Sequence, residues 1–155
     1  MGVIYKTSAT ASHEGRNGKA RSDDGLLDLS LAFPRELGGA GGATNPEQLF
    51  AAGYAACFTS AIQLVARENK MSLGSPEVTC NAGLESAPDG KFRLFAGLDV
   101  SLPGASRDDA ETALREAHAI CPYSRAVRGN VDVTLRLTRW KDHDGSDAPL
   151  ELSQS

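Results

Sequence analysis

The sequence predicts an α+β protein, and three observations support this prediction. Alternating apolar and polar residues indicate β-strands both near the N-terminus and in the second half of the chain. Between them lies an uncharged stretch, residues 48–66, which is typical of a long buried helix. A second helical pattern precedes the last strand, so strands and helices do not alternate regularly. This order favours antiparallel sheets around a long central helix over a doubly wound parallel sheet.

The first third is expected to form a small antiparallel sheet. Alternation from Val3 to Ala9 indicates a strand, and Asn17-Gly18 is a typical hairpin turn. Residues 27–33 alternate again, with leucines on one face. The glycine-rich segment 34–47 lacks the Gly-Lys-Ser/Thr of a phosphate-binding loop, so we interpret it as a mobile lid or pocket wall.

The long helix is predicted to run from Pro46 to about Lys70, with Asn45 as N-cap and Pro46 at the first helical position. Its length raises the possibility of a membrane span, but its Gly, Ser, Thr and Gln residues favour a buried helix. The inward face is expected to contain Leu49, Gly53, Ala56, Cys57, Ser60, Ala61 and Leu64.

The second half is expected to contain three more strands and one helix. Strands are predicted at 78–84 and 92–102, joined by a turn at 88–90, and at 131–137. A helix is predicted at 107–120, ending at Pro122. Its inward face would hold Ala110, Ala113, Leu114, Ala117 and Cys121.

Residues 1–140 are predicted to form one domain, followed by an acidic, disordered tail at 141–155. The net charge of the 155-residue chain is −4, and the last fifteen residues account for −3 of it, with one Lys against three Asp and one Glu. The nearly neutral body argues against a nucleic-acid surface. An odd number of cysteines, without a signal-peptide pattern, predicts a location in the reducing cytoplasm.

The three cysteines are the main candidates for chemistry. Cys57, Cys80 and Cys121 stand far apart without a CxxC or a His at ligand spacing, so we expect neither a metal site nor a cofactor. Cys57 and Cys121 both lie on inward helix faces and could form a disulfide if the fold brings them together. The alternative is that Cys57 and Cys121 are buried in separate parts of the core. We interpret Cys80, on the apolar face of a strand, as a packing residue.

A reactive Cys57 would need a cation from another segment, because its helix has none before Arg67. Arg16, at the hairpin tip, is a candidate, although it could simply be a solvated turn residue. Glu47 could complement the helix dipole. Ten residues of helix span about 15 Å, so Glu47 cannot meet Cys57 within one straight helix. Glu47 would have to come from a second subunit, or Arg16 would have to bridge the gap.

Three segments resemble the organic hydroperoxide resistance (Ohr) branch of the Ohr/OsmC thiol peroxidases. They are "GRNGKARSDDGLLDLSL" (15–31), "TNPEQLFAAGYAACF" (44–58) and "CPYSRAVRGNVDV" (121–133). The resemblance extends over about residues 1–139. Cys80 and the tail after Trp140 are not part of the family pattern.

The resemblance implies an OsmC-like fold in an intertwined homodimer, with two sites at the subunit interface. It makes Cys57 the peroxidatic cysteine and Cys121 the resolving one. Arg16 then activates the thiolate, and Glu47 positions Arg16. The implied reaction reduces organic hydroperoxides to alcohols through a Cys57 sulfenic acid and a Cys57–Cys121 disulfide, which a dithiol such as a lipoylated protein reduces.

The apolar surroundings of Cys57 suggest why organic substrates would be preferred, since each buried CH₂ contributes roughly 0.8 kcal/mol. The candidate substrate-binding residues are Phe33, Leu37, Phe50 and Phe58, with ordinary core packing as the alternative. Two other functions remain open: a non-catalytic dimeric binding module with the same fold, and another branch of the superfamily.

Overall fold

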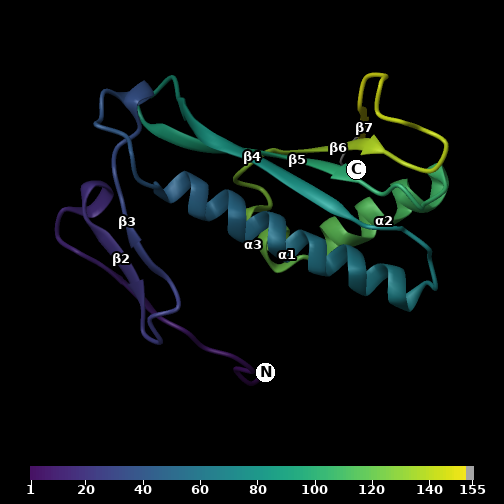
Figure 1. Ribbon diagram of the computed structural model, residues 1–155, viewed down its shortest axis with the longest axis horizontal. Helices are drawn as coiled ribbons and strands as arrows, with labels where there is room; N and C mark the ends of the chain where they lie inside the picture. Colours follow the sequence, from purple (N-terminus) through teal and green to yellow (C-terminus); the bar gives the residue numbers. More distant parts are fainter. Residues whose placement is uncertain (153–155) are drawn as a thin grey trace. The chain divides into compact units, whose positions relative to one another are not determined.

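The structure is a computed structural model that describes residues 1–152 (Figure 1). The chain divides into two compact units, Met1–Leu49 and Phe50–Ser155, where we expected a single domain over residues 1–140. The reason is that each unit has a β-sheet of its own. Helix α1 (Pro46–Glu68) begins in the first unit and continues into the second.

The first unit contains a three-stranded antiparallel sheet, as expected. Its strands are β1 (Ala9–Ala11), β2 (Lys19–Ser22) and β3 (Asp28–Ser30), in the order β1-β2-β3. A short 3₁₀ helix, η1 (Gly15–Asn17), lies between β1 and β2. A second one, η2 (Arg35–Leu37), lies between β3 and the long helix that follows. The predicted strand from Val3 is wrong for residues 3–8. The paired residues end at Ala9 and Ser22, and one further backbone bond runs from the Asp23 amide to the Ser8 carbonyl. The chain then turns at Gly25, so residues 3–7 have no strand to pair with in the described part of the chain.

The second unit contains a four-stranded sheet in the order β4-β5-β6-β7. Its strands are β4 (Glu77–Ser86), β5 (Phe92–Ser101), β6 (Val133–Arg139) and β7 (Leu150–Leu152). The pairs β4–β5 and β6–β7 are antiparallel, but β5 and β6 are parallel. A parallel pair needs a long crossover. Helices α2 (Arg107–Ile120) and α3 (Pro122–Val127) provide it.

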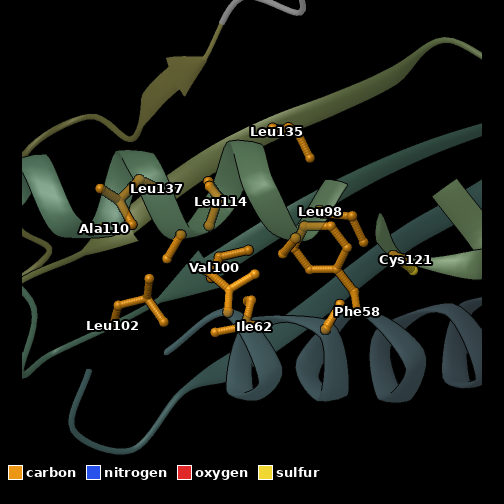
Figure 2. Packing of buried hydrophobic residues seen from close by; sticks show 14 of the residues in the cluster. Phe58, Ile62, Leu98, Val100, Leu102, Ala110, Leu114, Cys121, Leu135 and Leu137 are labelled. Atoms are coloured by element: carbon orange, nitrogen blue, oxygen red, sulfur yellow. The ribbon is translucent and has the colours of Figure 1, made fainter. Parts of the chain in front are cut away.

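The core of the second unit lies between this sheet and helices α1 and α2 (Figure 2). Alternate residues of β5 and β6, including Leu98, Val100, Leu135 and Leu137, point into it. The predicted inward face of α2 is confirmed, since Ala110, Ala113, Leu114, Ala117 and Cys121 are all fully buried. The Ser106 hydroxyl accepts a hydrogen bond from the Asp109 amide and so caps the start of α2.

The predicted inward face of α1 is only partly correct. The buried residues are Tyr54, Phe58, Ala61, Ile62 and Val65, a spacing of i, i+4, i+7, i+8 and i+11. Ala61 is shared with the prediction, whereas Ser60 and Leu64 are exposed and Cys57 is half-buried at the edge of the face. The large aromatic and branched side chains set the orientation, because burying them removes more apolar area from water than burying alanines does.

Helix α1 is long and apolar enough to cross a membrane, judged by length and composition alone. A core helix passes the same test, and one face of α1 does pack in the core of the second unit. Within this single chain, however, only 28% of its apolar window is buried. Much of the apolar surface of α1 is therefore uncovered by the chain's own side chains.

The expectation of a disordered tail at 141–155 is wrong for its last described residues. Leu150 and Leu152 pair with Leu137 and Leu135, so β7 completes the sheet beside β6. Leu152 is only 5% exposed. The two leucines are two residues apart and therefore face the same side of the strand. They give an otherwise polar segment enough apolar area to pack against the core, while residues 153–155 lie outside the described residues.

We expect Leu152→Ala to lower the free energy of unfolding by about 2 kcal/mol, the lower end of the usual range for a buried leucine. Urea denaturation would measure the loss. Glu151→Ala is the matched control, because the exposed Glu151 side chain points away from the core. Equal stabilities for the two variants would contradict the packing of β7.

Candidate functional site

The fold brings Cys57 and Cys121 together, although 64 positions separate them in the sequence. Their sulfur atoms lie 3.5 Å apart, and the Cys121 thiol points toward the Cys57 sulfur. Both are free thiols, Cys57 half-buried and Cys121 fully buried. The alternative of two cysteines in separate parts of the core is therefore wrong.

Cys121 owes its position to the junction between α2 and α3. Its amide donates to the Ala117 carbonyl as the last bond of α2, and its carbonyl accepts from Arg125 in α3. The backbone at Cys121 is extended, with φ −58° and ψ 123°. The following Pro122 explains this conformation, because a proline disfavours helical geometry in the residue before it. Pro122 thus ends α2, as predicted, and also begins α3.

The environment of Cys57 within the second unit does not activate its thiol. Burial is the largest influence and raises the pKa of Cys57, and the neighbouring Cys121 raises it further. The backbone N–H of Tyr123 acts in the opposite direction, because it donates a hydrogen bond to the sulfur and lowers the pKa. None of these influences is a cation. Activation of Cys57 by a positive charge from another segment stays a prediction.

Cys80 has the inert character expected of it. It lies on β4, half-buried against the hydrophobic core. Burial raises the pKa of its thiol to about 11. At neutral pH Cys80 therefore remains a protonated, weakly nucleophilic thiol.

Arg16 and Glu47 form a bidentate ion pair in the first unit. The Arg16 Nη2 donates to Glu47 Oε1 at 2.6 Å, and Nη1 donates to Oε2 at 2.8 Å. Arg16 lies in η1 at the hairpin tip, and Glu47 in the first turn of α1. The Arg16 hydrogen bonds lower the pKa of Glu47, and those of Glu47 raise the pKa of Arg16. Arg16 is therefore not simply a solvated turn residue.

The start of α1 places the Glu47 carboxylate. Asn45 is the N-cap, as predicted, since its Oδ1 accepts a hydrogen bond from the Gln48 amide at 2.9 Å. On the other side of the pair, the Arg16 guanidinium carbon lies 5.6 Å from the centre of the Phe33 ring. Arg16 is thus held by both a carboxylate and an aromatic face.

The four candidate substrate-binding residues fall into different environments. Phe33 lies against Arg16, and Leu37 is 49% exposed in η2. Phe50 is half-buried in an aromatic group with Tyr54 and Tyr123, its ring centre 5.7 Å and 6.5 Å from theirs. Phe58 is fully buried in the core, so the core-packing alternative is correct for this residue.

Sequence reasoning missed Tyr54 and Tyr123, which surround the segment before Cys57. A Cβ added to Gly53 would lie 2.9 Å from the Tyr123 hydroxyl oxygen and 3.2 Å from its ring. Glycine is unfavourable inside a helix. Its presence one turn before Cys57 was the signal that another group approaches α1 closely at this position.

The described residues thus contain two functional groups, a dithiol in the second unit and a restrained cation in the first. The dithiol can undergo reversible oxidation to a disulfide. The arginine fork can stabilise a nearby thiolate or other anion. Among residues 1–152, no group of three or more His, Cys, Asp or Glu side chains is placed to hold a metal ion.

This chain is similar to known proteins in both sequence and fold. The sequence profile of the OsmC-like protein family matches residues 39–136. The organic hydroperoxide resistance protein of Xanthomonas axonopodis pv. citri is 49% identical over 137 residues, which are 87% of this chain and 95% of that protein.

Two solved structures are similar in fold as well as in sequence. An organic hydroperoxide resistance protein from Legionella pneumophila superposes with a TM-score of 0.83 at 50% identity, covering 90% of this chain and 99% of that one. OhrB of Bacillus subtilis superposes with a TM-score of 0.79 at 40% identity, covering 87% of this chain and 99% of that one. Since the profile match also includes Glu47 and both cysteines of the dithiol, the chain belongs to the OsmC-like protein family.

Proposed function

We propose that this protein is a thiol-dependent peroxidase that reduces organic hydroperoxides to alcohols. Its relatives are named for organic hydroperoxide resistance, which supports a role in defence against organic peroxides. The observation that carries the proposal is the 3.5 Å contact between the Cys57 and Cys121 sulfurs.

In the proposed reaction, the Cys57 thiolate attacks the distal oxygen of the hydroperoxide. The O–O bond breaks, Cys57 becomes a sulfenic acid, and the alkoxide leaves as the alcohol after taking a proton from solvent. The Cys121 sulfur then attacks the Cys57 sulfur, the S–O bond breaks, and the hydroxyl leaves as water with the thiol proton. The resulting disulfide needs an external dithiol for reduction, for which we propose a lipoylated protein.

We assign the activation of Cys57 to Arg16. The pKa of Cys57 is raised within its own unit, so a cation is needed to obtain a reactive thiolate at neutral pH. Arg16 is permanently charged and is held by Glu47 in a two-point contact. Glu47 and Cys57 are ten residues apart on α1, about 15 Å of helix, so Glu47 acts on Cys57 only through Arg16.

A homodimer is part of the proposal, and exposed apolar surface supports it. In the first unit, Val3, Ile4 and Leu26 are each at least 85% exposed, and Leu31 is the one buried hydrophobic residue among those described. A unit of 49 residues cannot be stable without a core of its own. A second copy of the chain would cover such surface, as well as the uncovered apolar side of α1.

The substrate class follows from the aromatic surroundings. Phe50, Tyr54 and Tyr123 lie in the segments that carry the two cysteines, and Phe33 contacts Arg16. Apolar groups of an organic hydroperoxide gain free energy from contact with such side chains, whereas hydrogen peroxide has none to bury. We further propose that the protein acts in the cytoplasm, where a reducing environment keeps its cysteines as thiols.

We expect Cys57→Ser to abolish consumption of cumene hydroperoxide, because serine cannot form a sulfenic acid. Cys121→Ser should consume one equivalent and retain the added oxygen on Cys57 in intact-mass spectra. Cys80→Ser is the control and should turn over normally. Activity retained by Cys57→Ser would contradict the assignment, and an inactive parent would favour the non-catalytic binding module. Faster reaction with hydrogen peroxide than with cumene hydroperoxide would favour another branch of the superfamily.

We expect Arg16→Ala to shift the rise of the peroxidase rate to higher pH. The thiolate is the nucleophile, so the rate increases as the pH passes through the pKa of Cys57, and losing the cation raises that pKa. Each unit of increase lowers the thiolate fraction near neutrality about tenfold. Stopped-flow rates against pH would show the shift.

Arg21→Ala is the matched control for this experiment, since Arg21 belongs to the same unit and its side chain is 67% exposed beside Asp28. Glu47→Gln should give a smaller shift than Arg16→Ala, because it loosens the guanidinium without removing it. An unchanged profile for Arg16→Ala would show that the activating charge comes from elsewhere.

Sedimentation equilibrium should give a mass about twice the 16.3 kDa of one chain, because a stable dimer is the usual way to bury so much apolar surface. A monomer at micromolar concentration would contradict the homodimer.

A further inference from the structure

Three polar side chains in the second unit form a hydrogen-bonded chain that the proposed reaction does not use. The Tyr54 hydroxyl lies 2.8 Å from the Ser124 hydroxyl, and the Ser124 hydroxyl lies 3.0 Å from Nδ1 of His118. Tyr54 and Ser124 are fully buried. Ser124 is also the one residue classed as polar in the buried set of residues 1–152. Buried polar groups in proteins are usually hydrogen-bonded, and these two bonds satisfy the Ser124 hydroxyl.

Ser124 can satisfy both partners at once. A serine hydroxyl has one proton to donate and two lone pairs that accept. Burial raises the pKa of Tyr54 to about 12, so the tyrosine keeps its proton at neutral pH and can donate it to Ser124. Ser124 can then donate to His118. With the opposite polarity, His118 donates to Ser124 and Ser124 to Tyr54.

Each member of this chain lies three residues from a cysteine of the dithiol. Tyr54 precedes Cys57 on α1, His118 precedes Cys121 on α2, and Ser124 follows Cys121 on α3. Residues three apart are neighbours on a helix surface. The bond between His118 and Ser124 therefore spans the extended backbone at Cys121, and the bond from Ser124 to Tyr54 connects this junction to α1.

The same serine also restrains the first turn of α3. Tyr123, its neighbour in the chain, donates its backbone N–H to the Cys57 sulfur. The Tyr123 ring lies against Gly53, and its centre is 5.9 Å from that of Tyr54. A displacement of Ser124 would therefore move the Cys121 backbone and the Tyr123 amide together, relative to Cys57.

We propose that Ser124 is a positioning residue for the condensation step, and that it holds the α2–α3 junction against α1 so that the Cys121 sulfur stays within reach of the Cys57 sulfenic acid. This inference rests on the proposed peroxidase function. In this step the S–S bond forms, the S–O bond of Cys57 breaks, and the thiol proton of Cys121 leaves with the hydroxyl as water. Disulfide geometry is narrow, so a small error in the approach of the two sulfurs slows the reaction strongly.

Ser124→Ala tests the proposal by separating the two chemical steps. A misplacement of about 1 Å can cost a reaction as much as 100-fold, so we expect condensation to slow about 10- to 100-fold. Formation of the sulfenic acid should slow much less than condensation, because the activating cation is unchanged and only the Tyr123 amide contact to the Cys57 sulfur is disturbed. Quenched-flow samples analysed by intact mass would resolve the steps, since the sulfenic acid adds one oxygen and the disulfide loses two hydrogens.

A second expected result is greater sensitivity to excess cumene hydroperoxide. A sulfenic acid that waits longer for Cys121 reacts with a second hydroperoxide molecule and becomes a sulfinic acid. Ser124→Ala should therefore accumulate sulfinic acid on Cys57 at a lower peroxide dose than the parent does. A purely structural role for Ser124 would lower stability without changing this partition.

Asn69→Ala is the matched control. The Asn69 side chain donates to Glu116 Oε2 at 2.9 Å and so connects the end of α1 to α2 without touching Ser124 or either of the two cysteines. We expect this variant to lose stability and to condense at the parent rate. If Ser124→Ala does not fold because the Tyr54 hydroxyl is left unpaired, the double variant Tyr54→Phe/Ser124→Ala removes that hydroxyl and gives the same kinetic test.

The outcomes distinguish this inference from the function on which it rests. A parent that forms no sulfenic acid would refute both. An active parent whose Ser124→Ala variant condenses normally, or loses both steps equally, would overturn only the positioning role of Ser124.

Discussion

The contact between the Cys57 and Cys121 sulfurs depends on how three helices meet. Cys121 lies where α2 ends and α3 begins, and Pro122 keeps the backbone extended there. Cys57 reaches this junction from α1 because Tyr54 and Phe58, on either side of it in the sequence, are anchored in the core. Figure 2 shows Phe58 and Cys121 in this core. The packing of α1 against the α2–α3 junction therefore sets the 3.5 Å distance between the two sulfur atoms.

The dithiol and the ion pair have complementary electrostatic properties. Burial brings the two thiols together but disfavours the thiolate, because a charged sulfur loses solvation in an apolar environment. The Arg16–Glu47 pair carries charge that stays ionised, since each partner favours the charged form of the other. In the proposed mechanism a reactive cysteine needs both properties, the first from the second unit and the second from the Arg16–Glu47 pair.

Local signals in the sequence predicted much of this structure. Asn45 and Pro46 located the start of α1, and the alternation of β4 and β5 located their hairpin. The orientation of α1 was not predictable from small residues alone, because the choice between two faces depends on the tertiary packing of Tyr54 and Phe58. β7 was missed for a similar reason. Its two leucines become a strand only when β6 offers an open edge, which no local pattern in a polar tail reveals.

The three cysteines also show why burial alone cannot identify a reactive thiol. Cys80 and Cys57 are both half-buried, and burial raises the pKa of both. Their surroundings differ in what acts on the thiol. The Tyr123 amide and the Cys121 thiol influence the pKa of Cys57 in addition to burial. For Cys80, burial raises the pKa to about 11. A thiol with that pKa stays protonated in neutral solution and reacts slowly with peroxide. In the proposed peroxidase, Cys80 can therefore stay a packing residue while Arg16 activates Cys57 alone.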